Sequence, residues 1–183
     1  RPTDAAAPAR HARRRPGFSR VCRGRAVRGR GAAGSARRAV IAEPVRIPVD
    51  LPSGVSSVSG LWDAPADASA TIALAHGAGA GMAHPFLEGL ATALAADGFA
   101  VLRFVFPYIE AGRRMPGTVA AATGTWAAVQ EWCAEASAPG AFVAAGKSYG
   151  GRMASVAAAE GVIVPDGLVY LGYPLHPPGR PDK

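Results

Sequence analysis

Apolar residues along this chain fall into two alternating patterns, and the alternation predicts the order of its secondary-structure elements. Short, nearly unbroken apolar runs predict buried strands at residues 71–76, 99–106, 142–145 and 167–172. Between them, longer segments with helical apolar spacing or alanine-rich composition predict helices at residues 85–97, 118–136 and 152–160. Strands that alternate with helices in this way indicate an α/β fold, with a mostly parallel, right-handed sheet and helices on both faces.

A looser pattern precedes the first of these strands. Residues 45–50 and 55–62 alternate between apolar and polar positions, and a Pro-Ser-Gly turn at residues 52–54 separates them. We therefore expect an antiparallel hairpin to open the sheet.

The first two predicted helices each have one apolar face. These faces consist of Leu87, Leu90 and Leu94 in the first helix, and of Trp126, Val129 and Cys133 in the second. Gly98 is expected to end the first helix, and Trp126 is expected to be a core residue rather than a ligand contact.

The positive charge of the chain is concentrated near its N-terminus. Residues 1–38 contain twelve arginines and one acidic residue, a formal charge of +11, whereas residues 39–183 contain eight basic and twelve acidic residues, a formal charge of −4. Arginine, glycine, alanine and proline without apolar periodicity are typical of disorder. We therefore expect a disordered Arg-rich leader, or an over-extended gene start, at residues 1–38, followed by one domain at residues 39–183. A chain of that size can bury roughly 70% of its unfolded surface around one core.

A G-x-S-x-G motif centred on Ser148 follows the apolar run at residues 142–145 directly. At such a strand-to-helix turn the flanking glycines, Gly146 and Gly150, allow close backbone approach, and the serine hydroxyl is raised into a cleft. The motif alone is weak, but its context agrees, because a strand precedes it and a helix follows. We predict that Ser148 is a nucleophile and that the Tyr149 N–H is one donor to an oxyanion. The alternative is a Gly-rich turn with an incidental serine.

The glycine-rich segment at residues 77–81 predicts the second oxyanion donor. It follows the strand at residues 71–76, and its small residues let the backbone approach a substrate carbonyl. We assign the donor to Ala78, with Gly79 as the second choice. His76 is interpreted as a structural residue that holds the loop, although a role as general base stays open. A phosphate-binding loop is disfavoured, because no Lys-Ser/Thr follows the glycines.

Several motifs in order resemble one family. They are His76–Phe86, Val101–Phe104 with Phe106–Tyr108, Gly112–Arg114, Gly146–Ser155 and Gly172–Pro178. The segment from Thr71 to Lys183 is similar to the α/β-hydrolase branch related to testis-expressed and nonspecific-lethal-complex-subunit proteins, itself similar to dienelactone hydrolases. The resemblance implies an α/β-hydrolase fold with Ser148 as nucleophile, so that residues 39–183 form a partial α/β-hydrolase domain. Tyr149 stands where the family pattern has methionine, which changes the pocket but keeps the backbone N–H.

The resemblance also implies a catalytic acid and a histidine on loops after later strands. Asp166 precedes the strand at residues 167–172, His176 lies in the loop directly after it, and Asp182 stands near the end, so none of them matches the family positions. We therefore expect the chain to be truncated at its C-terminus, with acid and base beyond Lys183, and to be inactive or nearly so. Its first residue, Arg1, also indicates a misplaced start.

Basic residues near the expected cleft leave two interpretations. Arg113 and Arg114 could hold a substrate carboxylate or phosphate, and Lys147 could favour anionic substrates. We favour a solvated loop and an internal ion pair between Arg103 and Glu110.

Three functional classes stay open. The first is a serine hydrolase that acts on a small-molecule ester, thioester or lactone through an acyl-enzyme on Ser148. The second is a non-catalytic α/β-hydrolase-like scaffold or interaction domain. The third is nucleic-acid binding by the leader, which is not expected, because Phe18 is its only aromatic residue for stacking.

Cofactors and metals are not expected, because the histidines and cysteines are scattered. With two cysteines and no framework of disulfides, the chain suits a reducing compartment, so we expect a cytoplasmic location. No apolar stretch is long enough to cross a membrane.

Overall fold

The computed structural model describes residues 42–176 apart from residues 53 and 138, so the expected leader at residues 1–38 lies outside the described part. The strands are β1 (Glu43–Pro48), β2 (Ser57–Asp63), β3 (Ala70–Ala75), β4 (Ala100–Phe104), β5 (Ala141–Lys147) and β6 (Gly167–Leu171). The helices are α1 (Pro85–Ala96), α2 (Pro107–Glu110), α3 (Val119–Ala136) and α4 (Tyr149–Ala159).

The strands form one sheet in the order β1-β2-β4-β3-β5-β6. β1 and β2 form the expected antiparallel hairpin, and β2 also runs antiparallel to β4. The other pairings are parallel: β3 pairs with both β4 and β5, and β5 pairs with β6. The predicted α/β fold with a mostly parallel sheet is therefore confirmed. Because parallel strands end at the same edge, the loops after β3, β4 and β5 meet there.

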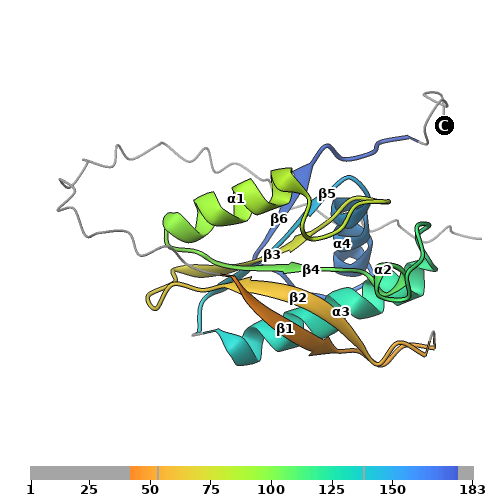
Figure 1. The fold of residues 1–183 in the computed structure, drawn as a ribbon, viewed down its shortest axis with the longest axis horizontal. Helices are drawn as coiled ribbons and strands as arrows, with labels where there is room; N and C mark the ends of the chain where they lie inside the picture. The colour runs from red at the N-terminus through yellow and green to blue at the C-terminus, as the bar shows by residue number, and fades with distance from the viewer. Residues whose placement is uncertain (1–41, 53, 138, 177–183) are drawn as a thin grey trace, which may run out of the picture. The chain divides into compact units, whose positions relative to one another are not determined.

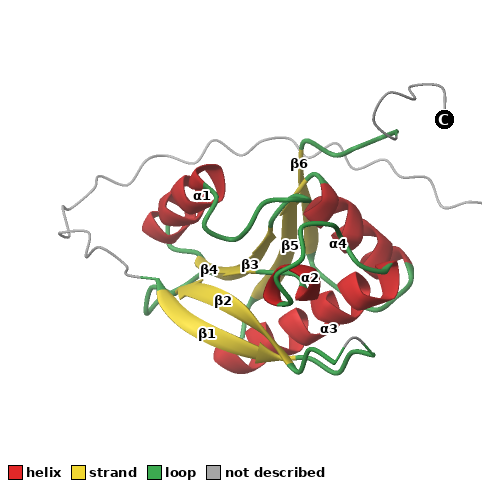
Figure 2. Cartoon of the chain, turned by 45° about the vertical axis from the view of Figure 1, so that its right-hand side comes forward, coloured by secondary structure: helices red, strands yellow, loops and turns green. Residues whose placement is uncertain are grey.

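Helices cover both faces of the sheet, with α1 on one side and α3 and α4 on the other (Figures 1 and 2). Alternate residues of the central strands face these two layers. In β3, Ile72 and Leu74 pack with Leu87 of α1, while Ala73 and Ala75 belong to the core that contains Trp126 of α3. Within the expected apolar stripe of α3, Trp126 and Val129 are completely buried and Cys133 nearly so.

The helix starts follow from local capping. His84 caps α1 by accepting a hydrogen bond from the Phe86 N–H at its Nδ1, and Thr118 caps α3 through the Ala121 N–H. Pro85 occupies the first position of α1, where its missing N–H costs nothing. Gly98 follows α1 with φ +91°, as a glycine that ends a helix can.

Two boundaries differ from the sequence prediction. The strand expected at residues 99–106 ends at Phe104, and the short helix α2 follows it, with Pro107 at its first position. The helix expected from residue 152 begins at Tyr149, because Ser148 is its N-cap. Among the described residues no helix is long and apolar enough to span a membrane.

Candidate active site

Ser148 lies in the turn between β5 and α4 with an unusual backbone conformation. Its φ is +49° and its ψ −110°, and it is the only non-glycine residue of the described part with a positive φ. Such a conformation costs a non-glycine residue about 1–3 kcal/mol and persists only where its surroundings impose it. The Ser148 N–H donates to the Leu171 carbonyl at 2.9 Å, and the Ser148 carbonyl accepts from the Arg152 N–H at 3.0 Å. The turn is therefore fixed from both sides.

The glycines of this turn are required by close backbone contacts. A Cβ on Gly146 would lie 2.3 Å from the Gly151 nitrogen, and one on Gly150 would lie 2.6 Å from the His76 carbonyl oxygen. Gly151 is equally restricted, because its Cβ would lie 2.6 Å from the Gly146 oxygen. The sequence motif indicated the first two of these glycines and missed Gly151, which stands one position beyond the pattern.

The loop after β3 lies next to Ser148. A Cβ on Gly77 would be 3.7 Å from the Ser148 Cβ, which is an ordinary van der Waals distance, so the two loops lie against each other at this point. Ala78 and Gly79 follow and are exposed, and Gly79 has a φ of +72°. In the described loops the N–H groups of Ala78 and Gly79 make no backbone hydrogen bond, whereas the Ala80 N–H donates to the Gly77 carbonyl at 3.2 Å. The turn that contains Ser148 and Tyr149 and the loop that contains Ala78 therefore lie at the same edge of the sheet.

His76 is fully buried and both of its ring nitrogens are engaged. Its Nε2 accepts a hydrogen bond from the Phe106 N–H at 3.2 Å, so its Nδ1 carries the proton and donates to the Gly77 carbonyl at 2.8 Å. Burial lowers the pKa of His76, with the Gly77 contact opposing the shift, so the neutral ring is favoured at neutral pH. These bonds connect the loop after β3 to the loop after β4, which is the structural role expected for this histidine.

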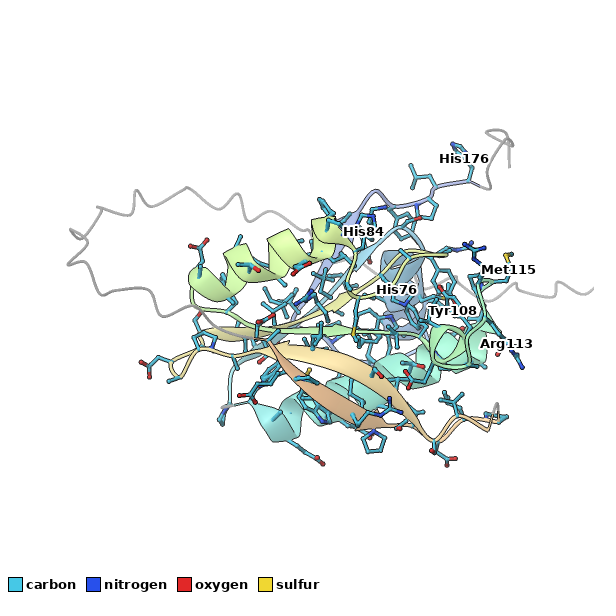
Figure 3. The ribbon with its side chains drawn as sticks, in the orientation of Figure 1. His76, His84, Tyr108, Arg113, Met115 and His176 are labelled. Atoms are coloured by element: carbon cyan, nitrogen blue, oxygen red, sulfur yellow. The ribbon has the colours of Figure 1, made fainter. Side chains whose placement is uncertain are left out.

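An aromatic cluster stands beside the serine turn. The ring of Phe106 contacts those of His76 and Tyr149 at centroid distances of 5.2 and 5.3 Å, and Tyr108 adds contacts of 6.0 Å to His76 and 6.3 Å to Tyr149. Figure 3 shows His76 and Tyr108 close together at this end of the sheet. Burial raises the pKa of Tyr149 to about 12, and it also raises the pKa of Tyr108, so both hydroxyls stay protonated at neutral pH. No role was predicted for the Tyr108 side chain, because a tyrosine after a strand has no distinctive spacing.

The ion pair expected between Arg103 and Glu110 is absent. Arg103 instead lies 3.5 Å from Asp63, with both side chains buried, and donates to the Met82 carbonyl at 3.3 Å. Burial raises the pKa of Asp63, and the nearby Arg103 charge opposes that shift. The expected pairing was wrong because Arg103 points to the α1 face of β4, while Glu110 lies against β2 and pairs with Arg46.

Other charged groups lie away from the serine turn or on its rim. Asp166 accepts a hydrogen bond from the Phe142 N–H at 2.8 Å, at the amino end of β5, which is the end opposite Ser148. Arg113 and Arg114 are exposed in the loop after α2, and Lys147 is half-buried. Asp182 lies outside the described residues. In the described ranges no three His, Cys, Asp or Glu side chains converge as metal ligands.

Hollows in the described part of the chain occur at both ends of the sheet. A cavity of about 10 Å³, roughly the space of one water molecule, is lined by Phe106, Tyr108, Tyr149 and residues at the start of α3. The larger hollow, of about 200 Å³, is lined by Trp62, Thr71 and small residues at the amino end of β3. This hollow lies at the end of the sheet opposite the serine turn, so its larger volume does not make it the candidate substrate site.

Comparisons with known proteins agree with this fold. The family model described as the alpha/beta hydrolase domain matches residues 68–183. The chain is similar to the structure of a dienelactone hydrolase from Anabaena variabilis, with 21% identity and a TM-score of 0.55 over 65% of this chain and 57% of that one. An α/β serine hydrolase without a lid from Xanthomonas campestris has 24% identity and a TM-score of 0.54, over 64% of this chain and 56% of that one.

A cold-adapted esterase from an Arctic intertidal metagenomic library has 20% identity and a TM-score of 0.54, over 69% of this chain and 59% of that one. The chain therefore spans less than two thirds of the length of these solved structures. At such identities the similarity shows the fold. No curated protein sequence matches the chain.

Proposed function

Because the chain belongs to the alpha/beta hydrolase domain family, we propose that it is a serine hydrolase that acts on an ester, thioester or lactone of a small molecule. The observation that carries the proposal is the strained conformation of Ser148 at the start of α4, with φ +49°. Strain of this kind is stored where the position of a side chain matters for function. The dienelactone hydrolase and the esterase among the similar structures support an ester-type substrate.

The proposed chemistry is acyl transfer through Ser148. Its Oγ attacks the substrate carbonyl carbon and loses its proton to a base, and the resulting tetrahedral oxyanion accepts hydrogen bonds from the Tyr149 and Ala78 N–H groups. The Tyr149 N–H is one of the free donors at the start of α4, where the helix dipole also favours negative charge. Collapse of the intermediate expels the alcohol or thiol and leaves an acyl-enzyme, which water then hydrolyses.

The base in this scheme is a residue other than His76. Removal of the Ser148 proton needs an unprotonated ring nitrogen in reach of its hydroxyl, and the only such nitrogen of His76 accepts from the Phe106 N–H. The same observation favours the second candidate, a non-catalytic scaffold that keeps the fold without the reaction.

Within the family, we place the chain in the branch related to testis-expressed and nonspecific-lethal-complex-subunit proteins, in a reducing, cytoplasmic compartment.

A fluorophosphonate probe distinguishes the two candidates. For a hydrolase, we expect the probe to label the full chain, with the modification found at Ser148 by mass spectrometry, and the Ser148→Ala variant to remain unlabelled. Ser155 of α4 provides the matched control, because its hydroxyl is engaged with the Arg152 carbonyl at 2.8 Å and with the Tyr173 hydroxyl at 2.9 Å, and Ser155→Ala should keep the label. An unlabelled wild-type chain that is folded by circular dichroism would favour the scaffold.

A further inference from the structure

Arg103 is a buried charged residue on β4 that the proposed chemistry does not use. It is 4% exposed and points to the α1 face of the sheet. Leu74 of β3 lies opposite it in register, and the core on this face is apolar. An ionised group in such surroundings costs free energy unless its partners compensate for the lost water.

Asp63, the last residue of β2, is the buried counter-ion of Arg103. In the antiparallel register Asp63 lies opposite Val101, so it stands diagonally across from Arg103 on the same face of the sheet. Arg103 Nη2 and Asp63 Oδ2 are 3.5 Å apart, which is longer than the about 2.7–2.9 Å of a strong charge-assisted hydrogen bond. Asp63 Oδ2 and Arg103 Nε have no hydrogen-bond partner in the described part of the chain. The two charges are therefore incompletely compensated, and a well-packed apolar pair would stabilise the sheet as well.

The same guanidinium group also reaches the loop after β3. Arg103 Nη1 donates to the Met82 carbonyl at 3.3 Å, and the Met82 side chain packs against the core on the other face of the sheet. One side chain thus connects β4, the end of β2 and the loop. The fork of an arginine suits this contact, because it presents donors to two acceptors at once.

The loop that Arg103 contacts is built from two consecutive turns. The Ala80 N–H donates to the Gly77 carbonyl in the first turn, and the His84 N–H donates to the Gly81 carbonyl in the second, both at 3.2 Å. The first turn contains Ala78, the proposed oxyanion donor. Because the two turns follow each other directly, a displacement of the second also moves the first.

The loop is attached to the β4 segment at both of its ends. At its start, His76 Nε2 accepts a hydrogen bond from the Phe106 N–H, which follows the end of β4. In its second turn, the Met82 carbonyl accepts from Arg103. Ala78 lies between these two attachments, so together they set the position of its N–H relative to the serine turn.

We propose that Arg103 is a positioning residue for the proposed reaction. Through the Met82 carbonyl it fixes the loop that carries the Ala78 N–H, and Asp63 holds its guanidinium group in place. Positioning of this kind matters for rate, because a displacement of about 1 Å at a site can cost about 10²-fold. The catalytic meaning of Arg103 rests on the proposed function, whereas the attachment of the loop does not.

The test replaces the buried charges by apolar residues in the double variant Arg103→Met/Asp63→Leu. Because both charges are removed together, we expect the thermal midpoint to stay near that of the wild type or to rise. The bond to Met82 is lost, so the His84 amide should exchange with solvent deuterium about tenfold faster than in the wild type.

Two further amides show how far the change extends. The Ala80 amide of the first turn should also exchange faster in the double variant, because the two turns move together. The Arg152 amide, which donates to the Ser148 carbonyl, should exchange at the same rate in both proteins, because the serine turn keeps its own hydrogen bonds.

The second readout is the reaction of Ser148 with a fluorophosphonate. We expect the double variant to lower the limiting labelling rate about tenfold with little change in probe affinity, since the oxyanion donor is displaced and the rest of the site is kept. Arg103→Lys retains a charge beside Asp63 and thus avoids an unpaired buried carboxylate. Its limiting rate should also fall, because an ammonium group cannot span two acceptors as a guanidinium fork does.

Thr71→Val is the matched control for a loss of stability. It removes the hydrogen bond of 2.8 Å from the Thr71 hydroxyl to the Ser137 hydroxyl, near the amino end of β3 and away from the loop. We expect a lower thermal midpoint and an unchanged labelling rate. Slower labelling in this control as well would attribute the effect to lost stability and overturn the inference.

Three other outcomes would overturn the inference, and they are distinguishable. Equal His84 exchange in the wild type and the double variant removes the attachment of the loop, whatever happens at Ser148. Faster His84 exchange with an unchanged labelling rate removes the positioning role and leaves the serine hydrolase intact. A wild-type chain that the probe does not label removes the proposed function, and the catalytic meaning of Arg103 with it.

Discussion

At the scale of single residues, the site depends on one serine in a conformation that suits glycine and on glycines that no other residue can replace. Ser148 keeps a φ of +49° because its N–H and carbonyl are both bonded to neighbouring elements. Gly146, Gly150 and Gly151 allow these elements to approach within backbone contact. Strain at one residue is thus balanced by packing at three others.

Replacing Ser148 by glycine should separate this strain from the function of the hydroxyl. We expect Ser148→Gly to raise the free energy of unfolding by about 1 kcal/mol, because glycine adopts positive φ without penalty. Ser148→Ala keeps the strain, so its stability should stay near that of the wild type, and both variants should resist the fluorophosphonate. Urea denaturation measures the difference, and equal stability of the two variants would contradict the interpretation of Ser148 as strained.

The Gly150 position should tolerate no side chain. Gly150→Ala places a Cβ 2.6 Å from the His76 carbonyl oxygen, and we expect it to lower the free energy of unfolding by about 3 kcal/mol, since backbone atoms must move. It should also abolish labelling of Ser148. Gly89→Ala is the matched control, because the same change in α1 meets nothing within 4 Å. That variant should gain about 0.5–1 kcal/mol from better helix propensity. A smaller loss for Gly150→Ala than about 1 kcal/mol would argue against the contact.

At the scale of elements, hydrogen bonds between neighbouring segments fix the loops of the site relative to one another. His76 bonds the loop after β3 to the start of the loop after β4, and Arg103 holds the Met82 carbonyl from β4. Helix α2, which carries Tyr108, is attached to the hairpin of β1 and β2 by Glu110. The Glu110 carboxylate accepts hydrogen bonds from the Ser59 N–H at 3.1 Å and from the Ser59 hydroxyl at 3.2 Å, and it pairs with Arg46.

This attachment predicts a dependence of stability on pH. Burial raises the pKa of Glu110, but the Arg46 and Ser59 contacts outweigh it, and the net pKa lies below the ordinary value of 4.5. The stabilisation by ionised Glu110 is therefore fully present above about pH 4.5 and is lost as the pH falls through the lower pKa of the folded state. We expect Glu110→Gln to lower the free energy of unfolding at pH 7 by about 1 kcal/mol. The variant should also lose less stability than the wild type on acidification. Glu131→Gln, at an exposed position of α3, serves as control, and parallel pH curves for wild type and Glu110→Gln would rule out the linkage.

At the scale of the whole molecule, fold and charge are properties of different parts of the chain. The described part has the strand order and the two-sided core of an α/β hydrolase. The high isoelectric point of about 10.2 comes from the arginines of residues 1–38. We propose that these residues form a leader separate from the hydrolase domain at residues 39–183.

Deleting residues 1–38 should reverse the net charge and leave the site unchanged. The remaining chain carries a formal charge of −4, so we expect it to pass through a heparin column that retains the full chain. Any binding of the full chain to nucleic acid should weaken steeply with salt and disappear with the deletion. Ser148 should react with the fluorophosphonate at the same rate in both forms, and a slower reaction after the deletion would connect the leader to the site.

Much of this molecule was predictable because its signals are local. Strands, helices and the hairpin follow from the spacing of apolar residues along a few turns, and the Gly146–Gly150 motif follows from the geometry of one turn. Helix α2 was missed because four residues are too few to show a period, and Gly151 was missed because the motif ends one residue before it.

The sequence by itself therefore determined the order of the elements, the α/β class and the position of the candidate serine, since each depends on residues a few positions apart. The tertiary structure decided the ion pairs and the surroundings of the site. Arg46 meets Glu110 from 64 residues away, and Arg103 meets Asp63 rather than Glu110. Tyr108 joins His76 and Tyr149 in one cluster. These contacts depend on strand register and on which face of the sheet a side chain occupies, and that information arises only when distant segments pack against one another.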